Sequence, residues 1–160
     1  MDQPSEDRLA DVHPELAKRV RNLADNLLSQ NISIRITQGL RTWAQQLALY
    51  NQGRTSPGKI VTNAKPGDSL HNYGLAVDFV VMDGGMPDWS ASDPSWKAVL
   101  EAALNFGLAE GAQWRSFPDY PHLYLKEMPA NPDDNLRSIY EAAGMGAVWE
   151  DVSKTYLSEG

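Results

Sequence analysis

The stretch that decides how this sequence folds is Ser69-Leu70-His71-Asn72-Tyr73-Gly74-Leu75-Ala76-Val77-Asp78-Phe79. Its second half continues as an apolar run and stops at Asp83-Gly84-Gly85, which predicts a strand over residues 74–82 that ends in a turn. Side chains alternate along a strand, so the large apolar residues face the core and Asp78 lies on the opposite face, behind Gly74 and Ala76. A carboxylate on such a face needs a partner, either a cation or an arginine.

The first half of the same stretch carries a second polar group. His71 precedes Asp78 by seven residues, an odd number, so the two side chains cannot share one face of a regular strand. We therefore expect His71 to lie in a turn before the strand and to fold back over it. Tyr73-Gly74 supplies the flexible step that this turn needs.

A similar group recurs later as Asp119-Tyr120-Pro121-His122-Leu123-Tyr124-Leu125. Alternation predicts a short strand over residues 122–125, with the two leucines in the core and His122 on the other face. Two imidazoles and one carboxylate, from His71, His122 and Asp78, would make a zinc site with an open fourth position, as in catalytic rather than structural zinc.

Two further residues suit a hydrolytic reaction at such a site. A carboxylate must take a proton from the attacking water, and Asp119 is the candidate base. A fixed cation must stabilise the developing oxyanion, and Arg41 is the candidate. The competing interpretation pairs Asp78 with Arg35 or Arg41 and leaves His122 bonded to a backbone carbonyl; the spacing of the residues does not separate the two.

Composition excludes several other functions. The chain of 160 residues has no cysteine, so a metal can be held only by imidazole and carboxylate groups. The net charge of -7 and the scattered basic residues argue against nucleic-acid binding. No apolar run is long enough to insert into a membrane, and the acidic residues 1–7 do not begin a signal peptide, so we expect synthesis in the cytoplasm.

The remaining periodicities predict an α+β fold, a small antiparallel sheet with helices packed on one side. We expect helices over 5–30, 42–50 and 94–106, a strand over 32–36, a polar loop over 54–68, an aromatic loop over 113–121 and a partly helical tail over 136–156. His13, next to Pro14 near the start of the first helix, is interpreted as a solvated or capping histidine. The chain is expected to form one domain, residues 1–160, with its core at about 32–125.

The motif Ser-x-His-x-x-Gly-x-Ala-x-Asp at Ser69–Asp78, followed by acid-x-x-His at Asp119–His122, resembles the M15/LAS peptidases. This family includes D-Ala-D-Ala carboxypeptidases and dipeptidases, L-alanyl-D-glutamate endopeptidases and, as a related fold, hedgehog signalling domains. Segments 39–46, 49–54 and 59–67 are most similar to the L-alanyl-D-glutamate branch of phage endolysins and autolysins. The resemblance covers about residues 32–125.

The resemblance implies the role of each site residue. It assigns one Zn²⁺ ion to His71, Asp78 and His122, the catalytic acid and base to Asp119, and the stabilisation of the tetrahedral intermediate to Arg41. Substrate contacts are expected from Ser69, and also from Tyr73 and Gln45. Lys59 or Lys65 could meet a carboxylate of the peptide, although the plainer interpretation leaves both lysines solvated.

The expected function is zinc-dependent hydrolysis of bacterial peptidoglycan stem peptides at the L-alanyl-D-glutamate bond, by a monomer that acts on the cell wall. If the protein is of phage origin, a pore protein would release it. Three alternatives stay open: a D,D- or L,D-carboxypeptidase of the same fold, a non-catalytic zinc-bearing binding module, and a metal-free interaction domain. No wall-binding domain is visible in the sequence.

Overall fold

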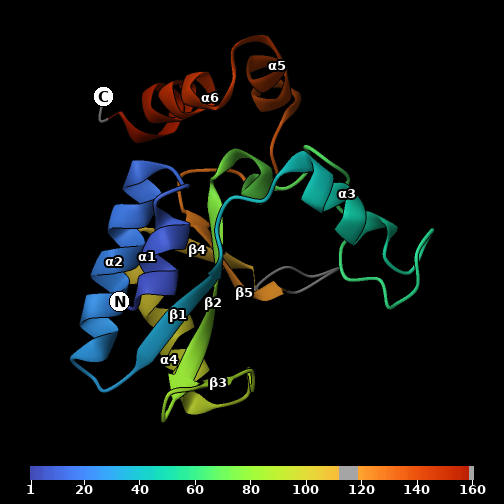
Figure 1. Ribbon diagram of the computed structural model, residues 1–160. Coiled ribbons are helices and arrows are strands. Elements are labelled where there is room, and N and C mark those ends of the chain that lie inside the picture. Colours follow the sequence, from blue (N-terminus) through green and yellow to red (C-terminus); the bar gives the residue numbers. More distant parts are fainter. Residues whose placement is uncertain (112–118, 159–160) are drawn as a thin grey trace.

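The computed structural model describes residues 1–111 and 119–158, which form an antiparallel sheet with helices around it (Figure 1). The strands are β1 (Ser33–Gln38), β2 (Ala76–Asp83), β3 (Met86–Asp88), β4 (Leu108–Gly111) and β5 (Asp119–Leu125). Their order is β1-β2-β5-β4, and β3 pairs with the far end of β2. The α+β fold with a small antiparallel sheet is therefore confirmed.

Strand β2 lies at the centre of the sheet, as its apolar sequence requires. Val77 and Phe79 face the same side as Ile36 of β1 and Leu123 of β5, and all four side chains are fully buried. Burial of an aliphatic or aromatic side chain stabilises the fold by about 1.5–3 kcal/mol, so this layer fixes which face of the sheet is inward. Asp78 is thereby held on the opposite face.

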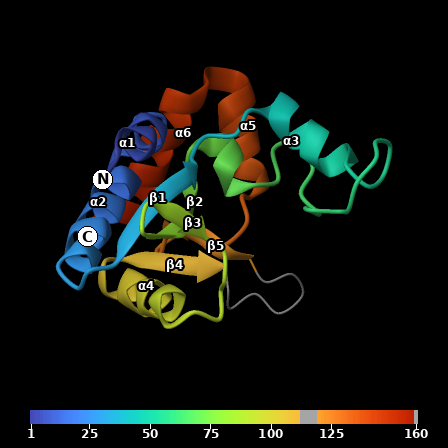
Figure 2. The ribbon, with the colours of Figure 1, turned by 60° about the horizontal axis from the view of Figure 1, so that its bottom comes forward.

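Helices α1 (Gln3–Leu9), α2 (Pro14–Leu28) and α4 (Pro94–Asn105) add buried residues to this core. Leu16, Val20 and Leu23 of α2 are fully buried, and Trp96 of α4 packs on Phe79 with ring centroids 4.7 Å apart. Helix α3 (Trp43–Asn51) projects from the body with the loop that follows it, and α5 (Asp134–Ala143) and α6 (Met145–Val152) lie across one end of the sheet (Figures 1 and 2). A π-helical turn, Ser153–Leu157, follows α6.

The single helix expected over residues 5–30 is wrong, because the chain forms α1 and α2 with a break between them. Pro14 has no backbone N–H and disfavours helical geometry in the residue before it, so α2 starts at Pro14. Of the two roles expected for His13, the capping role is confirmed, because its Nδ1 accepts a hydrogen bond from the Glu15 backbone N–H at 3.1 Å. The solvated alternative is wrong, because the side chain is buried.

Other differences concern short strands. The sequence interpretation missed β3 and β4, and it began the last strand at residue 122 rather than at Asp119. Most of the aromatic loop expected over 113–121 lies outside the described residues. Within the described ranges, no helix combines the length and the apolar character needed to cross a membrane.

Candidate metal and catalytic site

Two of the predicted metal ligands face each other across neighbouring strands. In the register of β2 and β5, Asp78 lies directly opposite His122, and such cross-strand partners hold their Cβ atoms about 4.5–5.5 Å apart. These positions are 44 residues apart in the sequence, so only the pairing of the strands brings them together.

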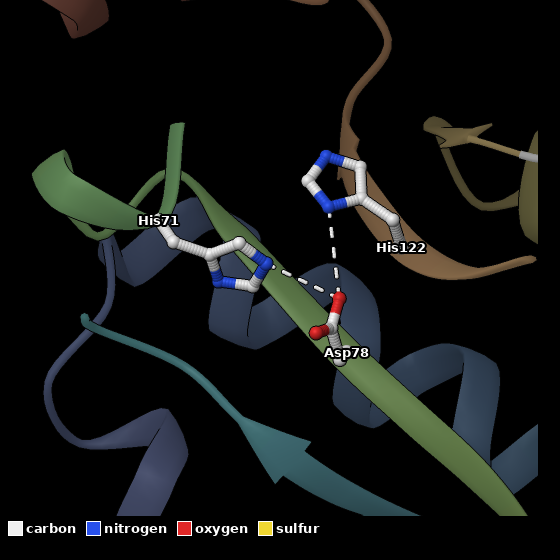
Figure 3. Close-up of side chains that lie close together, drawn as sticks. All are labelled: His71, Asp78 and His122. Carbon is white, nitrogen blue, oxygen red and sulfur yellow. Dashed lines mark hydrogen bonds and ion pairs between the residues drawn. The ribbon is translucent and has the colours of Figure 1, made fainter. Parts of the chain in front are cut away.

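His71 reaches the same place from a 3-10 turn, Leu70–Tyr73, as its odd spacing from Asp78 predicted. The Ser69 side chain caps this turn by accepting from the His71 backbone N–H at 3.2 Å. Gly74 ends the turn at φ +64°, a left-handed conformation that favours glycine. The turn thus points the imidazole back over β2 (Figure 3).

The three side chains converge on a common point. His71 Nε2 lies 3.1 Å and His122 Nδ1 3.6 Å from Oδ1 of Asp78, and one candidate ligand atom from each residue lies within 4.8 Å of the others (Figure 3). His71 Nδ1 lies 2.9 Å from the Gly39 carbonyl oxygen, which can only accept, so this nitrogen carries the proton. Nε2 is then left with a lone pair for a metal. Histidines that bind metals usually donate their other ring N–H to a carbonyl or carboxylate in this way.

The electrostatics of the cluster favour a bound cation. Burial opposes ionisation of Asp78, but the adjacent His71 and His122 hold the pKa of this carboxyl well below its usual range. Burial lowers the pKa of His122, which keeps its imidazole neutral. An ionised carboxylate and a neutral imidazole are the forms in which Asp78 and His122 could bind zinc.

Asp119 lies beside this cluster. Its Oδ2 is 3.7 Å from His122 Nδ1, and its side chain remains 36% exposed, so water and substrate can reach it. Burial and the nearby charge of Asp78 raise the pKa of Asp119. A carboxyl group next to a candidate metal site and within reach of water suits proton transfer.

Arg41 faces the cluster from the segment between β1 and α3. Its Nη1 donates to Gln46 Oε1 at 2.9 Å and its Nη2 to Gln38 Oε1 at 2.8 Å, while the nearest Asp78 oxygen is 4.0 Å away. Burial lowers the pKa of Arg41, but a guanidinium stays charged at neutral pH. Its two close partners are neutral amides, so much of its positive charge remains available to a developing oxyanion.

The contacts of Asp78 do not fit the competing interpretation, in which it pairs with an arginine. Arg35 donates to Asp2 at 2.6 Å and not to Asp78, and Arg41 makes its short bonds to the two glutamines. Asp78 makes its closest contacts with the two histidines instead. The arrangement resembles a ligand set more than an arginine–carboxylate pair.

These groups line a cleft of about 470 Å³. Its described lining comprises Gln38, Arg41, Leu49, Val61, Thr62, Asn63, Ala64, Asp68, Ser69, Leu70, His71, Asp78, Asp119, His122, Ala130 and Asn131. Part of the polar loop expected over 54–68 therefore forms one wall, and Ser69 lies in it as expected.

Two expected substrate contacts lie elsewhere. Tyr73 is fully buried and donates from its hydroxyl to the Gly67 carbonyl at 2.9 Å. Gln45 caps α3, accepting from the Thr42 backbone N–H at 2.9 Å. The sequence interpretation missed the adjacent Gln46, which is fully buried and donates to the Ala64 carbonyl at 2.9 Å. Neither helix periodicity nor composition distinguishes these two glutamines.

Comparison with known proteins agrees with this geometry. Residues 9–117 match the family described as VanY, D-alanyl-D-alanine carboxypeptidase. The chain is 39% identical over 124 residues to the peptidoglycan L-alanyl-D-glutamate endopeptidase CwlK of Bacillus subtilis, an alignment that covers 72% of this chain and 74% of CwlK.

More distant relatives share parts of the chain or the fold. The L-alanyl-D-glutamate peptidase of Listeria phage A118 is 35% identical over 64% of this chain, but the alignment spans only 34% of the phage protein. The crystal structure of the Serratia marcescens L-Ala D-Glu endopeptidase ChiX superposes with a TM-score of 0.61 at 24% identity, over 78% of this chain and 88% of ChiX. The D,D-dipeptidase VanXYg gives a TM-score of 0.57 at 18% identity, over 89% of this chain and 60% of that chain.

Proposed function

The chain belongs to the VanY family of D-alanyl-D-alanine carboxypeptidases, and from this premise we propose that it is a zinc-dependent peptidase that hydrolyses the L-alanyl-D-glutamate bond of peptidoglycan stem peptides. The observation that carries the proposal is the convergence of His71, Asp78 and His122 within 4.8 Å, beside an accessible carboxylate and a fixed arginine. We further propose that residues 1–160 act as one catalytic domain, as a monomer, on the cell wall.

The donor set fits one zinc ion. His71 would bind through Nε2, because its Nδ1 is committed to the Gly39 carbonyl, and Asp78 and His122 would bind through Oδ1 and Nδ1. Three nitrogen and oxygen ligands with a fourth position open are typical of catalytic zinc. When bound, the ion would act as a Lewis acid and lower the pKa of water.

Side chains of the protein carry out the proton transfer and stabilise the oxyanion. Asp119 accepts a proton from the attacking water and returns it to the departing amine. Arg41, held by Gln38 and Gln46, donates hydrogen bonds to the carbonyl oxygen as its negative charge develops. Ser69, which lies in the cleft wall, would hydrogen-bond the peptide backbone of the substrate.

The second candidate is a carboxypeptidase, favoured by the description of the matched family. Such an enzyme must bind a free terminal carboxylate, which calls for a cation at one end of the cleft. In the described lining, Arg41 is the one side chain of arginine or lysine, and the proposed mechanism already assigns it to the oxyanion. The cleft therefore favours an endopeptidase, in agreement with the activity named for CwlK.

Digestion of purified peptidoglycan tests this proposal. New N-terminal D-glutamate supports the endopeptidase, whereas released D-alanine supports the carboxypeptidase. Dye release from labelled wall, with and without a chelator, separates both enzymes from a non-catalytic zinc module. Metal analysis of the purified protein should give one zinc per chain; a metal-free chain with full activity would refute the mechanism.

A further inference from the structure

The C-terminal helices lie beyond the matched segment 9–117, yet they pack against the turn that carries His71. Trp149 of α6 donates from Nε1 to the Tyr73 carbonyl at 2.7 Å. Tyr140 of α5 stacks on Trp43 with centroids 5.1 Å apart and meets the Tyr73 ring edge-on at 5.9 Å. The contact with Trp43 sets α5 beside the start of α3 (Figures 1 and 2).

Arg137 of α5 contacts the cleft wall through Asp68. Its Nη2 donates to Asp68 Oδ1 at 2.6 Å and to the Pro66 carbonyl at 3.2 Å, and its guanidinium lies 5.2 Å from the centre of a Trp43 ring. Asp68 lines the cleft, whereas Arg137 is not among the lining residues. A charged, bonded and stacked guanidinium is better ordered than most surface arginines.

The backbone at Gly67 leaves room for the Arg137 guanidinium. Gly67 has φ +85°, and a Cβ added there would lie 2.7 Å from Arg137 Nη1. From the other side, Asn72 Oδ1 accepts from the Gly67 backbone N–H at 3.0 Å and from the Ser69 backbone N–H at 3.3 Å. The wall segment 66–69 is therefore held between the His71 turn and the C-terminal tail.

The charge of Asp68 gives this contact a second consequence. The Asp68 side chain is 51% exposed and faces a cleft that, under the proposed function, receives an acidic peptide. Like charges repel, and a carboxylate without a counter-ion would raise the free energy of the bound substrate. Arg137 offsets that charge without entering the cleft.

From these contacts we propose that Arg137 is a positioning residue, which holds the Asp68–Ser69 wall in place and neutralises Asp68 so that the cleft accepts a carboxylate-bearing peptide. The inference rests on the proposed function for its substrate. It makes the C-terminal tail, through Arg137, a support of the substrate site.

The test compares full-length variants on a soluble stem peptide. Arg137→Met should raise KM about tenfold and change kcat less than about twofold, because the reacting groups are untouched. Arg137→Lys, which keeps the charge, should recover most of the loss. In an Asp68→Asn background, Arg137→Met should change KM by less than about twofold, since the charge that it offsets is gone.

Arg21→Met is the matched control. It removes an ion pair to Glu6 at 2.8 Å, whose side chains are exposed to a similar degree as those of Arg137 and Asp68. Arg21 lies on α2 and does not line the cleft, so the substitution should leave KM and kcat unchanged. Equal effects of the two arginine substitutions would overturn the proposal. So would a KM within twofold of wild type in Arg137→Met, or an undiminished effect in the Asp68→Asn background.

Hydrogen exchange gives a readout that does not depend on activity. The Gly67 and Ser69 amides should exchange faster in Arg137→Met than in wild type and remain unchanged in Arg21→Met. If the wild-type chain cuts no stem peptide, the proposed function fails, and this exchange measurement still decides whether Arg137 holds the wall. Unchanged exchange at both amides would overturn the positioning role.

Discussion

Replacement of Gln46 by leucine should reveal how much the polar network behind the cleft contributes to stability and to catalysis. Gln46 is fully buried and makes three contacts: it accepts from Arg41 Nη1 at 2.9 Å and from Asn72 Nδ2 at 3.3 Å, and it donates to the Ala64 carbonyl at 2.9 Å. Leucine is of similar size, so the substitution removes the hydrogen bonds without opening a large cavity.

The size of the effect follows from the partners that remain. Asn72 Nδ2 keeps its bond to the Arg41 carbonyl at 3.1 Å, so its loss is small. Arg41 Nη1 and the Ala64 carbonyl would each lose the partner found here, at about 1–1.5 kcal/mol each in a half-buried setting. The free energy of unfolding should fall by about 2–3 kcal/mol, or Tm by roughly 4–12 °C for a domain of this size.

Urea denaturation in the presence of excess zinc measures this change, and hydrolysis of a stem peptide measures its effect on Arg41. With one of two tethers gone, the guanidinium should be less well ordered, and kcat should fall about tenfold while zinc content stays at one per chain. Gln45→Leu is the matched control, because the neighbouring glutamine caps α3 outside the cleft. A loss below about 0.5 kcal/mol in Gln46→Leu, with kcat unchanged, would refute the reasoning.

Three further predictions concern single side chains. Asp119→Ala should lower kcat/KM about 10²- to 10⁴-fold with zinc still bound, and full activity in this variant would remove its role in proton transfer. His71→Ala should lose both stoichiometric zinc, measured by metal analysis, and activity; retained zinc would contradict the ligand assignment. Burial lowers the pKa of His13, so the unfolded chain takes up the proton first and stability falls as pH drops below about 6.5, by less than about 1.4 kcal/mol per pH unit. His13→Asn keeps a capping oxygen but not the titration, so its urea midpoint should fall less between pH 7.5 and 5.5 than that of wild type.

The sequence predicted those parts of the site that depend on strand periodicity. Alternation placed Asp78 and His122 on the face away from the core, and the odd spacing placed His71 in a preceding turn, because both follow from a side-chain period of two. The pairing of Asp78 with His122 was not predictable in this way. Their register is set by the packing of Val77 and Leu123 into a core assembled from distant segments.

Helix α3 shows where periodicity fails. Gln46 is its only buried residue, so no apolar stripe indicates which face of α3 is inward, and Gln45 and Gln46 are equivalent by sequence. The short strand β4 was missed for a related reason, since four residues with one glycine give too little alternation to recognise. The break before Pro14 was also missed, although the geometry of proline indicates a helix boundary there.

Strand pairing holds two of the three candidate ligands in place, whereas single hydrogen bonds hold the third. Asp78 and His122 are fixed by the backbone ladder of β2 and β5, which cannot move without disturbing the core. His71 is fixed by individual hydrogen bonds: its backbone carbonyl accepts from the Arg41 N–H at 2.9 Å, and its ring bonds to Gly39. Arg41 and His71 therefore move together, so a substitution in the surrounding loops that shifts one ligand should also shift the oxyanion donor. Loop variants are expected to lose metal affinity and kcat in parallel, whereas variants of the β2 core should lose the fold before they lose either.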